Sequence, residues 1–180
     1  TLVADNLPLL AVNLQYVSSG VTTLADGVLA VFDSSFTNAP TDEDASKIPN
    51  TAESISILNS TAQLSIDARK MPQINDTLFL NVLRLTKPQY NLQIFSEQMA
   101  GSGVTAYLQD NYLNTTQPLL LTDTNNIQIN INSGIPASYD LNRFRIVFHN
   151  SIVILPVQFV SIKASLKNKE IRVDWSVAEE

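Results

Sequence analysis

The chain has 180 residues, a mass of 19.8 kDa and a formal net charge of −6 at pH 7. Hydrophobic residues make up 44% of it and charged residues 16%, which is the opposite of the balance found in disordered proteins. No apolar run reaches the ~18 residues of a membrane helix, and the acidic balance argues against a surface that neutralises nucleic-acid phosphates. We therefore expect a folded domain with no nucleic-acid partner and no membrane insertion.

Period-two alternation of apolar and polar residues predicts β-strands along most of the chain. In the first strand segment the apolar side chains share one face, while Asn13 and Gln15 point the other way. Residues 37–51 carry Asn, Pro and an acidic trio, which is typical of a surface loop. The predicted strand segments are, in chain order, 10–16, 27–33, 55–57, 64–68, 77–85, 90–94, 104–109, 127–132 and 143–149.

The spacing of these segments indicates the fold class. No segment keeps a 3.6-residue period over three turns, and Gly, Pro or Asn separates the strands. Short strands with such turn signals are typical of sandwiches and barrels, and two packed sheets bury them economically. We predict an all-β fold for residues 1–154, an antiparallel two-sheet β-sandwich of the jelly-roll or immunoglobulin-like kind.

The last part of the chain, residues 155–180, predicts one β-hairpin. It starts at Leu155-Pro156 and turns at Lys167-Asn168-Lys169, with the only tryptophan, Trp175, on its apolar face. A hairpin alone is only marginally stable in water. We therefore expect it to pack on the first domain, to pair with another chain or to belong to a domain that continues past Glu180, and we favour the last.

Several residues and motifs on which common catalytic and metal sites depend are missing. Cysteine is absent, which excludes thiol nucleophiles, thiolate zinc sites and disulfides. The single histidine, His149, ends a strand segment, and no Gly-x-Ser-x-Gly elbow surrounds any serine. Gly101-Ser102-Gly103 lacks the Lys-Ser/Thr pair and the helix of a phosphate loop. We predict that the chain is not an enzyme, has no catalytic residues and needs no cofactor, calcium being the one candidate.

Two stretches near the end resemble a known module. They read Leu155-Pro-Val-Gln-Phe-Val-Ser-Ile-Lys-Ala164 and Ile171-Arg-Val-Asp-Trp-Ser-Val-Ala-Glu-Glu180. This pattern resembles the start of a fibronectin-III-like domain close to the type IX secretion sorting region of secreted Bacteroidetes proteins. Upstream, the segments 24–32, 75–81, 112–116 and 140–148 resemble the β-rich module that often precedes it.

The resemblance implies a location and a set of neighbours. It implies an extracellular or cell-surface protein whose partners are the neighbouring domains of the same parent chain. It brings no catalytic residue with it. The fibronectin-like part stops after two strands and no sorting domain follows, so we expect an excised or processed piece.

The acidic trio Asp42-Glu43-Asp44 is the candidate calcium site. Calcium takes six to eight oxygen ligands, often from loop carboxylates. The Asp-x-Asp-x-Asp-Gly spacing of the best-known calcium loop is missing. Solvated loop acids are therefore the favoured interpretation, with calcium as the alternative.

Aromatic residues and one threonine are the other candidates. Aromatic rings can stack on sugar faces, and Tyr107 and Tyr112 are the candidate ligand-binding residues, with packing as the favoured alternative. Arg143 and Arg145 share a strand face with His149, which we interpret as an ordinary outer face. Asp76-Thr77-Leu78 resembles a bacterial O-glycosylation motif, which makes Thr77 a candidate modification site.

These observations favour a non-catalytic structural or adhesion module of a secreted or cell-surface multidomain protein. One alternative is a glycan-binding accessory module that contacts surface glycans. Another is a subunit that self-associates through the edge strands 159–166 and 170–177. An enzyme fragment with two converging carboxylates ranks last, because the acids lie mostly in loops and at strand ends.

Overall fold

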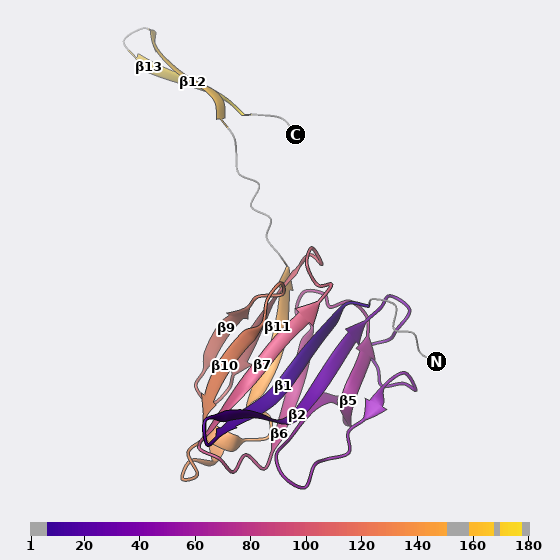
Figure 1. Ribbon diagram of the computed structural model, residues 1–180. Coiled ribbons are helices and arrows are strands. Elements are labelled where there is room, and N and C mark those ends of the chain that lie inside the picture. The colour runs from indigo at the N-terminus through magenta and orange to yellow at the C-terminus, as the bar shows by residue number, and fades with distance from the viewer. Residues whose placement is uncertain (1–6, 151–158, 168–169, 178–180) are drawn as a thin grey trace.

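The computed structural model describes residues 7–150, 159–167 and 170–177 (Figure 1). Their regular secondary structure is β-strand apart from one short 3₁₀ helix, which confirms that the fold is all-β. The elements are β1 (Leu9–Ser18), β2 (Val21–Phe32), β3 (Ala45–Ser46), β4 (Ser54–Asn59), β5 (Ala62–Arg69), β6 (Thr77–Leu83), β7 (Gln89–Glu97), β8 (Val104–Asp110), β9 (Thr115–Leu119), β10 (Asn125–Asn130), the 3₁₀ helix η1 (Pro136–Tyr139), β11 (Phe144–Asn150), β12 (Phe159–Lys167) and β13 (Glu170–Val177). Among them, no helix has both the length and the apolar character that crossing a membrane requires.

Strands β1 to β11 form one hydrogen-bonded sheet that curls until it is nearly closed (Figure 1). The order is β10-β7-β1-β2-β5-β4-β6-β11-β8-β9, and β3 pairs with β5 outside this path. Strand β11 is inserted between β6 and β8, so Phe144 lies opposite Leu80 on one side and Asp110 on the other. Because the hydrogen bonding is continuous, the predicted division into two sheets is not confirmed.

The prediction that all strands are antiparallel is wrong. Strand β2 pairs with β5 in parallel, from Leu29 opposite Ile66 to Phe32 opposite Arg69. A tight hairpin cannot make such a pair, because parallel neighbours need a long connection. Here residues 33–61, which include β3 and β4, provide that connection.

The concave side of the sheet holds one continuous core. Alternate residues point inward, as the period-two pattern predicted, and Leu14, Leu92 and Ile146 are fully buried. Burying each such side chain contributes about 1.5–3 kcal/mol relative to leaving it in water. The largest apolar members are Tyr90, Phe32, Phe144, Phe148, Leu10, Leu14, Ile55, Ile57, Leu78, Leu80 and Leu92.

Strands β12 and β13 form a separate antiparallel hairpin, as predicted for this segment. In its register Ile162 lies opposite Trp175 and Lys163 opposite Asp174, so one face is apolar and the other polar. The apolar side chains are largely exposed, Trp175 by 67%. The predicted domain boundary between residues 154 and 155 lies outside the described residues.

Candidate functional site

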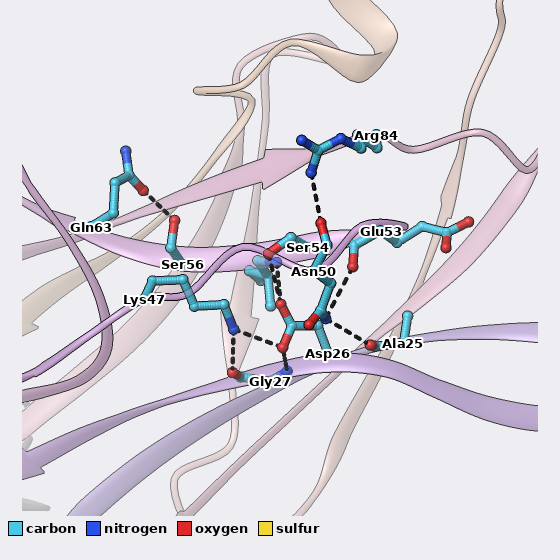
Figure 2. Close-up of polar contacts among 11 residues, drawn as sticks. Ala25, Asp26, Gly27, Lys47, Asn50, Glu53, Ser54, Ser56, Gln63 and Arg84 are labelled. Atoms are coloured by element: carbon cyan, nitrogen blue, oxygen red, sulfur yellow. Dashed lines mark hydrogen bonds and ion pairs between the residues drawn. The ribbon is translucent and has the colours of Figure 1, made fainter.

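Asp26 in β2 is the centre of a partly buried polar network that links β2 to β4 (Figure 2). Its carboxylate accepts hydrogen bonds from Lys47 Nζ at 2.6 Å, from Ser54 Oγ at 2.9 Å and from the backbone N–H groups of Ile55 and Gly27, both at 2.9 Å. Burial raises the pKa of Asp26, but these donors together hold it below its ordinary value. The network occupies the part of β2 that precedes its pairing with β5, so it fastens the strand there.

Glu53 lies next to this network and contacts the start of β7 and the residues just before it. Its carboxylate accepts hydrogen bonds from Tyr90 Oη at 2.9 Å and Thr86 Oγ1 at 3.1 Å, and it forms an ion pair with Lys87. Burial raises the pKa of Glu53, but the hydrogen bonds, that of Lys87 foremost, hold it at about 2. A carboxylate with so low a pKa stays ionised near neutral pH and cannot act as a general acid.

Arg143 is the largest fully buried side chain of the described residues, and it forms an ion pair with Asp110. The side chain is 1% exposed and binds Asp110 twice, from Nε at 3.0 Å and from Nη2 at 2.7 Å. It also donates to the carbonyl oxygens of Asn130 and Ser138. The interpretation of Arg143 as an outer-face residue is wrong, because it precedes β11 and the pleat of the strand does not fix its direction.

Tyr112, a predicted ligand-binding residue, belongs to this same cluster. The centre of its ring lies 4.9 Å from Cζ of Arg143, and its backbone N–H donates to Asp110. The ring is half-buried. In this position the ring packs on the guanidinium, and a role in ligand binding stays a prediction.

Tyr107 and Thr77 lie together on the outer face of β6, β11 and β8. Val147 of β11 separates them, because it lies opposite both. The ring of Tyr107 meets the ring of His149 edge-on at 5.2 Å, and Arg145 Nε donates to Gln109 at 2.6 Å. Tyr107 and Tyr112 therefore lie in different surroundings and do not form one row of rings.

Among the described residues, no partner is common to all three acidic side chains of the loop, Asp42, Glu43 and Asp44. Asp44 accepts hydrogen bonds from the backbone N–H groups of Ala68 and Thr41, both at 2.7 Å, and so ties the loop to β5. Glu43 accepts from the Thr41 hydroxyl, while Asp42 is exposed. Within the described ranges no three His, Asp or Glu side chains gather as metal ligands, and calcium at this loop stays a prediction.

The outer face of β1, β7 and β10 is covered by amide side chains, which sequence reasoning did not single out as a site. The registers place them in two rows across the three strands: Asn13, Gln93 and Asn126 in one row, and Gln15, Asn91 and Gln128 in the next. Gln89 and Asn130 begin a third row on β7 and β10. We call these eight residues the amide face. Amides at alternate positions in three strand segments are the signal that could have revealed it.

Hydrogen bonds between the side chains order the amide face. Gln93 Oε1 accepts from the amides of Asn13 and Gln15, both at 3.1 Å. Asn91 Nδ2 donates to Gln15 at 2.9 Å and to Asn126 at 3.2 Å. Gly27 stands opposite Asn13, and a Cβ atom there would lie 2.8 Å from Asn13 Oδ1. The missing side chain at Gly27 thus leaves the space that the Asn13 amide occupies.

A shallow groove of about 420 Å³ crosses the amide face. Its walls include Tyr16, Val17 and Thr22 from the β1–β2 hairpin, and its floor comes from the amides of β7 and β10. None of its lining residues carries a charge. The groove therefore offers uncharged hydrogen-bond donors and acceptors, and the nearby Lys87 Nζ lies 4.0 Å from the centre of the Tyr16 ring in its wall.

No protein-family model, curated protein or solved structure matches the chain. The assignment of a function therefore rests on the geometry of the chain itself. The resemblance to the module of secreted Bacteroidetes proteins stays a prediction.

Proposed function

We propose that the chain is a non-catalytic adhesion or structural module of a secreted or cell-surface multidomain protein. In this role the curled sheet presents or spaces neighbouring domains of the parent chain. The observation that carries the proposal is that the buried charged side chains pair with one another. Each buried charged side chain of the described ranges has an ion-pair partner within the fold, in the pairs Glu53–Lys87, Asp67–Arg69 and Asp110–Arg143.

The Glu53–Lys87 and Asp110–Arg143 pairs fasten strands and loops to one another, whereas Asp67 and Arg69 both lie in β5. A general acid near neutral pH needs a carboxyl group with a raised pKa. Asp26 and Glu53 have lowered pKa values instead, because Lys47 and Lys87 bind them. This supports a structural role for the acids.

Two experiments test the proposal: one measures catalytic activity and the other the location of the parent protein. The purified full chain is incubated with chromogenic esters and glycosides beside the Glu53→Gln and Asp26→Asn variants. We expect no turnover above the variants, and turnover that either substitution abolishes would overturn the non-catalytic role. In the native host, protease added to intact cells should degrade the parent protein at the surface, or the culture medium should contain it. A parent protein found only inside the cell would contradict the location.

Self-association through the β12–β13 hairpin is a second candidate function. The observation that favours it is the exposed apolar face, where Ile162, Val173 and Trp175 are exposed by 64%, 49% and 67%. Exposed apolar patches of this kind mark interaction surfaces. A second hairpin laid on this face would cover it.

Sedimentation velocity of the full chain over a wide range of concentration tests this candidate. We expect a concentration-dependent dimer that Trp175→Ser abolishes. Lys163→Ser, on the polar face of the same hairpin, is the matched control and should leave the dimer intact. A monomer at all concentrations would exclude self-association.

A further inference from the structure

We infer that the amide face is a binding site for a neutral polysaccharide, recognised through its hydroxyl groups. The inference rests on the proposed adhesion role and assigns it a surface and a ligand class. It places the contact on β1, β7 and β10 and not on the tyrosines that the sequence suggested.

The chemistry of the groups matches. A sugar hydroxyl donates one hydrogen bond and accepts others, and an amide side chain offers both functions on one planar group. Binding must replace the water on these groups with equally good partners, because a buried amide without a partner costs about 1–3 kcal/mol. A polymer with many hydroxyl groups can satisfy several amides at once.

The internal hydrogen bonds leave a set of unused donors and acceptors. Gln93 uses its oxygen for Asn13 and Gln15, while its Nε2 has no partner among the described residues. Asn91 uses its nitrogen twice, and its Oδ1 has no partner there. These two groups stand on the same face of β7, two residues apart. The internal bonds hold both side chains in place, so little side-chain entropy is lost when a ligand binds.

Because no charged residue lines the groove, we expect its ligand to be uncharged. An anionic polymer would gain from Lys or Arg, and none lines the groove. A peptide that adds as a strand would need an open backbone edge, and β7 and β1 pair on both sides. The free edge of β10 lies at the side of the amide face, so a strand added there would lie beside the groove and not in it. The volume of about 420 Å³ lies in the range of small-ligand sites, roughly 300–1,000 Å³, so the groove suits a short stretch of polymer.

Affinity electrophoresis of the full chain tests the inference. The gels contain a soluble β-glucan, a galactomannan, a xylan or the anionic polygalacturonate. We expect at least one neutral polymer to retard the protein and polygalacturonate to leave it unretarded. The double variant Asn126→Ala/Gln128→Ala should weaken the interaction about tenfold, as expected when one good hydrogen-bonded contact is lost.

The matched control is Gln73→Ala/Gln117→Ala, which removes two exposed amides away from the face and should bind like the native chain. Both double variants are first compared with the native chain by circular dichroism and thermal melting. Binding that the amide-face variant leaves unchanged, retardation by polygalacturonate alone, or no retardation in any gel would overturn the inference. Release of sugar from a polymer would instead contradict the proposed non-catalytic function, so the two failures can be told apart.

Discussion

The Arg143–Asp110 pair and the amide face use polar groups in opposite ways. The first buries two opposite charges and gives each of them several partners, with Arg143 1% exposed and bound to two carbonyl oxygens as well as to Asp110. The second keeps uncharged groups at the surface and satisfies only part of their capacity, since Gln93 Nε2 lacks a partner among the described residues. Buried charge here defines the architecture, and open amides provide a surface for contact.

Breaking the buried pair should have the largest effect. Arg143→Met leaves Asp110 charged and without its partner in the interior, which costs about 3–5 kcal/mol of unfolding free energy. Urea denaturation measures the loss. Arg145→Met, two residues along on the half-buried outer face, is the control and should cost less than about 1 kcal/mol. Equal losses for the two variants would show that burial of the guanidinium does not matter.

Glu53→Gln should have the next largest effect, and the effect should depend on pH. The pKa of Glu53 falls from 4.5 to about 2 on folding, so its ionisation stabilises the fold above pH 4.5 and this contribution is lost as the pH falls towards 2. We expect a loss of about 2 kcal/mol at neutral pH and convergence of the two stability curves in acid. Parallel curves from neutral to acidic pH would contradict the ion pair.

Asp44→Ala should have a smaller effect, about 1 kcal/mol, because two backbone N–H groups lose their acceptor. Asp42→Ala, in the same loop with an exposed side chain, should change the melting temperature very little. Repeating both melts with added calcium tests the loop as a metal site. An increase in melting temperature with calcium that either substitution removes would support it.

Gly27→Ala should change stability least and the amide face most directly. The new methyl group would collide with Asn13 Oδ1, and the flexible amide can move away at a cost below about 0.5 kcal/mol. We expect shifted NMR signals for the side-chain amides of Asn13 and Gln93 and weaker retardation by the polysaccharide. Unchanged amide signals would show that the close approach at Gly27 does not position Asn13.

The sequence predicted the parts of the fold that depend on local alternation. In β10, Ile127 and Ile129 point inward and Gln128 outward, as the period-two pattern indicated. The same pattern could not reveal that β2 pairs with β5 in parallel, because alternation carries no information about which strand lies beside which. The pattern also failed at Arg143. This residue lies just before β11, outside the pleat, and its side chain is buried where it binds Asp110.

The amide face could not be predicted from the sequence, because it too depends on which strands are neighbours. Asn13 and Gln93 lie 80 residues apart, and only the register of β1 against β7 brings their amides within hydrogen-bonding distance. Each strand alone looks like an ordinary strand with a polar outer face. The alternate amides could be read from the sequence, but their assembly into one face follows from the order of the strands.

The position of β11 has a consequence for the order of folding. This strand comes last among those of the curled sheet, yet it lies between β6 and β8, which precede it in the chain. While the chain emerges from the ribosome, β6 and β8 must wait for residue 150 with unpaired backbone edges. We therefore expect completion of the sheet to be slow, because distant segments must meet first, and the nascent chain to be most prone to aggregation just before β11 is available.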